Sequence, residues 1–82
     1  MRPRRLLERL NDGHLRDATF RDVLKFAEAL GFRVSRVRGS HHILTHERIH
    51  EQLNLQDAGG EAKPYQIRQL LDLIRQYDLE LR

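Results

Sequence analysis

The segment Arg38-Gly39-Ser40-His41-His42 carries the densest set of chemically active side chains in this 82-residue sequence. Histidine gives or takes a proton near neutral pH, and an arginine guanidinium stabilises charge that builds on a phosphate. Glycine allows an unusual backbone angle or the close approach of a phosphate, and serine adds a hydroxyl beside it. Such a set could cleave RNA, whose ribose 2′-hydroxyl is the nucleophile. The imidazole would deprotonate the 2′-OH or protonate the leaving 5′ oxygen, with no serine nucleophile or metal required.

Charge is concentrated around the same segment. Residues 1–50 hold 11 Lys or Arg against 6 Asp or Glu, whereas residues 51–82 hold 4 against 6. No acidic residue lies between Glu28 and Glu47, and this interval contains Arg33, Arg36 and Arg38. A positive zone on a small domain attracts polyanions such as nucleic acid. The alternative is that Gly39-Ser40 only turns the chain and that the arginines are solvated.

A second pattern, His46-x3-His50 with His42 nearby, has the spacing of metal ligands on a helix. The segment resembles strand and loop more than helix, and Glu47 is the only acidic residue within the spacing. We therefore predict no metal site and no cofactor.

Length and composition bound the function. Eighty-two residues, 39% of them hydrophobic, suffice for one small core. The absence of cysteine excludes a disulfide framework, a thiolate nucleophile and a cysteine zinc site. Apolar runs are too short for a membrane span, and the basic start has no apolar stretch of signal-peptide length behind it. A cytoplasmic protein is the expectation.

Three helices are predicted. Residues 4–10 form a short one, with Pro3 in its first turn, and Asn11-Asp12-Gly13 ends it. Thr19 caps the second, which ends at Gly31. Pro64 opens the last. The second helix buries one apolar face, made of Phe20, Val23, Leu24, Ala27 and Leu30, and the last buries another, made of Ile67, Leu70, Leu71, Ile74 and Tyr77.

Strands are predicted where the apolar period changes to two. The first begins at Phe32 and reaches Val37, the second spans residues 41–46, and a short third spans residues 52–56. Gly39-Ser40 is the first turn, and residues 57–61 are expected to form a loop. The fold class is then α+β: a three-stranded antiparallel sheet with one face covered by two helices and the other left to solvent or a partner.

His41 and His42 must point to opposite faces of the predicted sheet. If His42 shares the helix-covered side with Leu44, His41 projects from the open face with Ile43 and Thr45. The reverse is also possible, since each face carries one large aliphatic residue.

Three motifs in this order carry a resemblance to a known family: Gly31-Phe32, then residues 38–43 (RGSHHI), then residues 59–64 (GGEAKP) before the closing helix. From about Phe20 to Tyr77 the sequence resembles the HicA toxins of bacterial and archaeal toxin–antitoxin pairs. In many members a Pro-x-His precedes the Gly-Gly loop, whereas this chain has Asn54-Leu55-Gln56 there.

The resemblance implies a fold like that of the double-stranded-RNA-binding domain (dsRBD-like), with residues 1–18 as an N-terminal helical extension and residues 19–82 as the HicA-like domain. It also implies a metal-independent mRNA-cleaving toxin, an endoribonuclease neutralised by a cognate HicB-like antitoxin. Its acid/base is the histidine after Gly-Ser, His41. Gly39 and Ser40 would place the scissile phosphate, and Arg36 and Arg38 would be RNA-binding partners. The alternative function is a non-catalytic RNA-binding module, since the same basic surface binds phosphates without any acid/base group; a purely protein-binding role is a further one.

Overall fold

The computed structural model describes residues 4, 5, 7, 8 and 18–81. The elements after residue 18 are α2 (Phe20–Ala29), β1 (Arg33–Arg38), β2 (His41–His46), β3 (Ile49–Ala58), β4 (Glu61–Ala62) and α3 (Pro64–Tyr77). Residues 4, 5, 7 and 8 are helical, in agreement with the first predicted helix. Its remaining residues and the predicted stop at Asn11-Asp12-Gly13 lie outside the described residues.

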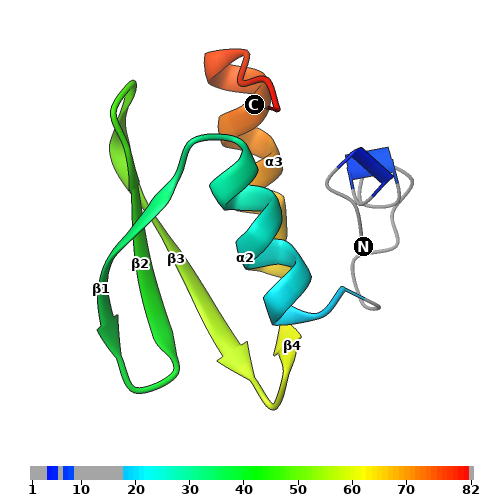
Figure 1. The fold of residues 1–82 in the computed structure, drawn as a ribbon, viewed down its shortest axis with the longest axis vertical. Coiled ribbons are helices and arrows are strands. Elements are labelled where there is room, and N and C mark those ends of the chain that lie inside the picture. Colours follow the sequence, from blue (N-terminus) through cyan, green and yellow to red (C-terminus); the bar gives the residue numbers. More distant parts are fainter. Residues whose placement is uncertain (1–3, 6, 9–17, 82) are drawn as a thin grey trace.

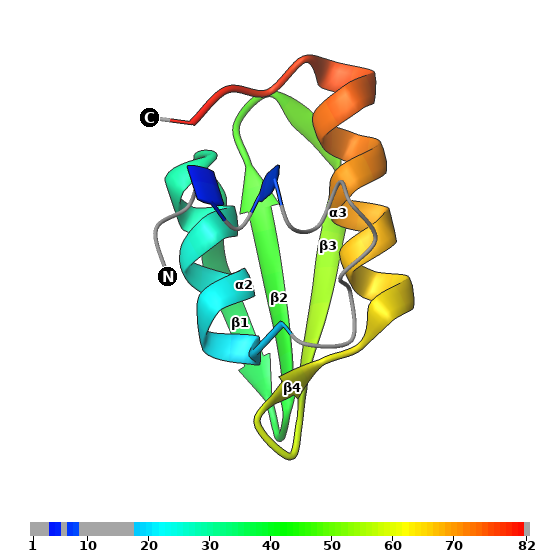
Figure 2. The ribbon, with the colours of Figure 1, turned by 90° about the vertical axis from the view of Figure 1, so that its right-hand side faces the viewer.

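The four strands form one antiparallel sheet in the order β1-β2-β3-β4. Both helices lie on the same side of it: in Figure 2 they stand in front of the strands, and in Figure 1 the sheet lies to their left. The helix–sheet–helix order and the α+β class agree with the predicted dsRBD-like fold. The face turned away from α2 and α3 is called the open face below.

The predicted extent of the third strand and the predicted loop after it were both wrong. The third strand runs from Ile49 to Ala58 rather than over residues 52–56, and its first residue, Ile49, already pairs with His46 of β2. The expected loop at residues 57–61 is a tight turn, because Asp57 and Ala58 pair with Ala62 and Glu61. The polar residues of these segments gave no strand pattern in the sequence, because strand pairing depends on the partner strand as well as on side-chain polarity.

Local sequence explains both helix starts. The Thr19 hydroxyl accepts a hydrogen bond from the Asp22 backbone N–H at 3.1 Å, as the capping pattern predicts. Pro64 stands in the first turn of α3, where its missing N–H costs nothing. Gly31 has φ 104°, the positive angle expected just after the helix.

The core lies between the helices and β2–β3. The predicted helix faces are correct in outline, with Leu24, Ile74 and Tyr77 only partly buried and Phe26 an unpredicted core member. Leu44, Leu53 and Leu55 supply the sheet side of the core. Burying each such side chain contributes roughly 1.5–3 kcal/mol, so this side of the sheet anchors the fold.

Candidate functional site

The burial of the β2 side chains shows which of them face the helices and which lie on the open face. Leu44 is completely buried and His46 nearly so, whereas Ile43 and Thr45 are only partly buried. His42 lies on the helix side, where its ring is 4.7 Å from that of Phe20. Side chains alternate along a strand, so His41 lies on the open face. Of the two arrangements that the sequence allowed, the structure has the one that exposes His41.

The register of the sheet places an arginine beside His41. Arg38 on β1 and Gln56 on β3 are the cross-strand partners of His41. Directly opposed residues share a face, so both lie on the open face next to the imidazole. The next layer along the sheet is Arg36 and Asn54, opposite Ile43.

A β-bulge in β1 places Arg33 on the same face as Arg36 and Arg38. Val34 pairs with Leu44 but Arg36 pairs with Ile43, so Ser35 is an extra residue without an opposing partner. Its hydroxyl donates to the backbone oxygen of Ile43 at 3.1 Å. Strict alternation would put Arg33 and Arg36 on opposite faces, and the bulge brings them to the same one.

The result is a cationic row on the open face, made of Arg33, Arg36 and Arg38, which we call the arginine row. All three side chains are exposed, and the sequence had predicted only Arg36 and Arg38 as site residues. The Ser35 insertion between two Arg-Val pairs was the signal that could have revealed Arg33. Together the three guanidinium groups give one edge of the open face a strong positive charge.

The His41 imidazole has one contacted nitrogen. Its Nδ1 lies 3.4 Å from the Asn54 side-chain oxygen, a long hydrogen bond in which Nδ1–H donates. In the neutral imidazole this arrangement leaves the lone pair on Nε2, which makes no hydrogen bond to any described residue. Asn54, missed as a site residue, could have been found from its alternation with the buried Leu53 and Leu55. A half-buried imidazole with an available lone pair can accept a proton.

Gly39 and Ser40 form the turn that joins β1 to β2 beside His41. Gly39 has φ 57°, and a Cβ there would meet no other atom within 4 Å, so the backbone angle rather than crowding requires glycine. Ser40 is held in place: its backbone oxygen accepts from the Asp57 N–H at 2.9 Å, and its hydroxyl accepts from the Gln56 amide at 3.3 Å. The turn is therefore fixed against β3, and the Ser40 hydroxyl donates to no described acceptor in the structure.

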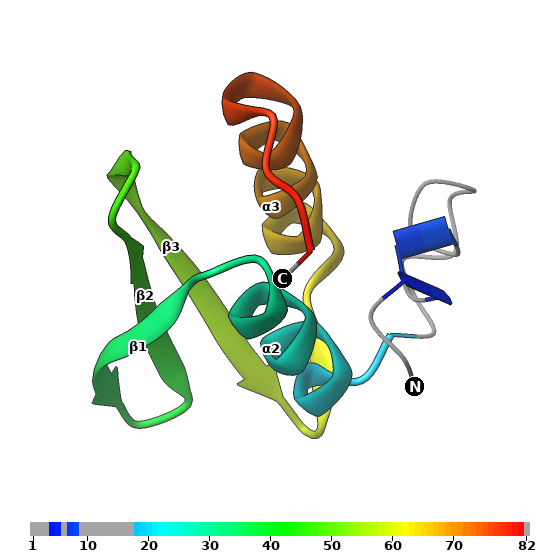
Figure 3. The same cartoon turned by 45° about the horizontal axis from the view of Figure 1, so that its top comes forward.

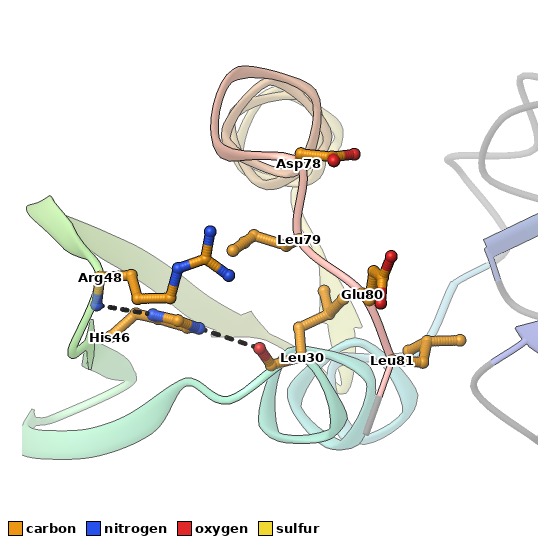
Figure 4. Close-up of a pocket in the computed structure, with 7 residues that line it drawn as sticks. All are labelled: Leu30, His46, Arg48, Asp78, Leu79, Glu80 and Leu81. Atoms are coloured by element: carbon orange, nitrogen blue, oxygen red, sulfur yellow. Dashed lines mark hydrogen bonds between the residues drawn. The ribbon is translucent and has the colours of Figure 1, made fainter.

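His46 has a structural role instead of a metal-binding one. Its Nε2 donates to the Leu30 backbone oxygen at 3.0 Å and its Nδ1 accepts from the Arg48 N–H at 3.1 Å, as Figure 4 shows. Both ring nitrogens are thus committed to the backbone. Among the described residues no group of three or more potential ligand side chains could hold a metal ion.

Comparison with protein-family models matches residues 20–79 to the HicA toxin of bacterial toxin-antitoxin systems. The match covers 60 of the 82 residues, from the start of α2 to just beyond α3. This chain belongs to the HicA toxin family. Membership makes it the toxin component of a toxin–antitoxin pair, whose partner is an antitoxin protein. Searches of curated proteins and of solved structures find no match.

The matched range begins after the N-terminal residues, so it includes the whole open face and excludes residues 1–19. No helix among the described residues of this HicA family member is long and apolar enough to cross a membrane.

Proposed function

We propose that this HicA family toxin is an endoribonuclease that cleaves mRNA in the cytoplasm with His41 as its acid/base. The observation that carries the proposal is the position of His41: its imidazole stands on the uncovered face of the sheet, with Arg38 opposite on the neighbouring strand. Family membership supports a toxic activity, and the arginine row supports a polyanionic substrate.

The proposed reaction uses the ribose of the substrate as nucleophile. His41 Nε2 takes the proton of the 2′-OH while the 2′ oxygen forms a bond to phosphorus. The bond from phosphorus to the 5′ oxygen breaks, and that oxygen leaves with a proton from solvent. The products carry a 2′,3′-cyclic phosphate and a 5′-hydroxyl. Nδ1–H facing Asn54 selects the tautomer of the neutral ring whose lone pair is on Nε2, which suits a base.

The remaining site residues would hold the phosphate. Arg38 and Arg36 would place guanidinium groups next to the negative charge that builds on the phosphorane. They would stabilise the transition state more than the ground state, because the charge is larger there. Gly39 and Ser40 present a turn without bulky side chains, and the Ser40 hydroxyl can donate to a phosphate oxygen. The Gln56 amide donates a hydrogen bond to the Ser40 hydroxyl and does not ionise near neutral pH, so Gln56 would act as a positioning residue.

The antitoxin is proposed to be a HicB-like protein that covers the open face. Acidic groups on it would pair with the arginine row, and its contact would bury His41. Inhibition then follows from steric exclusion of RNA from the imidazole.

Expression of the toxin without an antitoxin tests the proposal. Growth should stop and mRNA should decay, and His41→Ala should abolish both effects while its circular dichroism spectrum stays that of the folded protein. His50→Ala is the matched control, because His50 is an exposed histidine of the same sheet, on β3. Undiminished toxicity of His41→Ala would overturn the role of His41. RNA binding that is lost at high salt, with no cleavage by the wild type, would favour the non-catalytic RNA-binding module.

A further inference from the structure

The open face is divided lengthwise into three rows of different chemistry. The arginine row lies on β1, and β2 follows with His41, Ile43 and Thr45. On β3 a row of amide side chains alternates with the buried leucines. We call this the amide row, and it consists of Gln52, Asn54 and Gln56. The register places Asn54 and Gln56 on the open face, and alternation with the buried Leu53 places Gln52 there. Adjacent strands are about 4.8 Å apart, so roughly 10 Å separates the arginine row from the amide row.

The widths of the three rows match the parts of a nucleotide. A phosphate on β1 and a base edge over β3 are separated by the ribose, which would lie over β2 beside the imidazole. Asn and Gln side chains offer both a donor and an acceptor to base edges, and only unpaired bases present those edges. The open face therefore suits single-stranded RNA.

His41 stands at one end of this surface. Beyond it in one direction, at the bottom of Figure 1, lie the Gly39-Ser40 turn between β1 and β2 and the hairpin of β3 and β4. Residues 57–62 of that hairpin include the carboxylates Asp57 and Glu61 and no basic side chain that could hold a phosphate. In the other direction the face continues past Ile43 to Arg33 and its partner Thr45, and Figure 3 shows β2 and β3 running on beyond β1 to the turn that joins them. From Arg38 back to Arg33 the strand spans roughly 13–16 Å at about 3.3 Å per residue, less the bulge.

We propose that single-stranded RNA lies along β1 with its backbone on the arginine row and its bases toward the amide row, so that the protein contacts the substrate on one side only of the cut bond. This rests on the proposed ribonuclease function. Arg33 and Gln52 are the residues farthest from His41 in this arrangement. They bind nucleotides distant from the scissile phosphate, and the nucleotides on its other side leave the protein past the turn.

Oligonucleotides with a single cleavage site test the arrangement. The RNA is shortened one nucleotide at a time from its 5′ end or from its 3′ end, and kcat/KM is measured for each length. Shortening on one side should lower kcat/KM about tenfold for each bound phosphate that is removed, whereas shortening on the other should change it less than twofold. Equal decreases on both sides would overturn the proposal. Failure to cleave even long RNA would instead contradict the ribonuclease function itself.

Arg33→Ala links the asymmetry to the arginine row. For wild type, removing the nucleotide whose phosphate Arg33 binds should lower kcat/KM about tenfold. For Arg33→Ala, the ratio of kcat/KM with and without that nucleotide should fall toward one. The slope of log affinity against log salt should become less steep by about one. Arg68→Ala, an exposed arginine on α3, is the matched control and should keep both values. A ratio that stays tenfold in Arg33→Ala would contradict the placement of the backbone.

Gln52→Ala tests the amide row by sequencing of cleavage sites in a random RNA library. Base preference at the position farthest from the cut should weaken in this variant and persist in Gln76→Ala, an exposed glutamine on α3. A preference that is the same in both variants would exclude base contact by Gln52. A duplex of the same sequence should resist cleavage, and efficient cleavage of it would overturn the single-stranded substrate.

Discussion

His41 and His46 are two histidines of strand β2 that lie five residues apart and face opposite sides of the sheet. His46 is 5% exposed, and both of its nitrogens bond to the backbone. His41 is half-buried on the open face, and its hydrogen-bond partner is the Asn54 side chain. The same residue type thus serves structure on one face and is available for chemistry on the other. Burial and the commitment of the ring nitrogens separate the two roles.

The remaining side chains of the two faces show the same difference between stabilising the fold and being available for binding. The covered face is held by leucines and by hydrogen bonds that leave no described buried side-chain nitrogen or oxygen without a partner. The open face gathers arginines and amides that add little to stability, since exposed charges stabilise a fold weakly. Residues that contribute little to folding are free to be selected for binding and catalysis.

Replacing His46 should give the largest effect on stability. His46→Ala removes a packed ring and leaves the Leu30 oxygen and the Arg48 N–H without their partner. Urea unfolding should show a decrease of about 2–4 kcal/mol in the free energy of unfolding. His41→Ala and the exposed His50→Ala should each change it by less than about 1 kcal/mol. Equal decreases at His46 and His41 would remove the distinction between the two histidines.

Deleting Ser35 sharpens the account of the open face. Without Ser35, β1 reads Arg-Val-Arg-Val-Arg, a strict alternation that keeps all three arginines on one face without a bulge. RNA affinity should therefore stay within about threefold of wild type, whereas Arg36→Ala should weaken binding about tenfold because one phosphate is no longer neutralised. Filter binding at fixed salt measures both. A deletion variant as weak as Arg36→Ala would show that the bulge itself shapes the binding surface.

The smallest expected effect lies on the helix side. The Tyr77 hydroxyl donates to both oxygens of Glu51, at 2.8 and 2.9 Å, and this hydrogen bond to a carboxylate raises the pKa of Tyr77 above its ordinary value of 10.0. The neutral phenol is the form that the folded state favours. Its stabilising contribution is thus complete below about pH 10 and is lost as the pH rises through the folded-state pKa.

An absorbance titration of the phenols checks this pair. Glu51→Gln should move the ionisation of Tyr77 to lower pH, and Tyr77→Phe should remove that transition from the curve. An unchanged titration in Glu51→Gln would show that the carboxylate does not hold the phenol.

The sequence predicted the elements whose signals are local. Thr19, Gly31 and Pro64 mark helix ends through their own local chemistry, so both ends of α2 and the start of α3 followed from them. The extra length of β3 and the presence of β4 did not, because the partner strand decides pairing of polar residues.

The site residues likewise divide into those that a local motif predicts and those that depend on strand pairing. His41 was predicted from its motif, but its face depended on whether Leu44 or Ile43 entered the core, which side-chain alternation alone leaves undecided. Arg33 and Asn54 reach the site through the bulge at Ser35 and through the β2–β3 register. Both are properties of strand pairing and belong to no single segment of the sequence.

The proposed reaction depends most on transfer of the ribose 2′-OH proton to His41, and cleavage of a short RNA by the purified toxin tests this step directly. Wild type should release a product with a 2′,3′-cyclic phosphate, and a single 2′-deoxyribose at the cut nucleotide should block the reaction. His41→Ala should slow cleavage by about 10² to 10⁴-fold. Cleavage by His41→Ala at the wild-type rate, or cleavage of the 2′-deoxy substrate, would contradict the account.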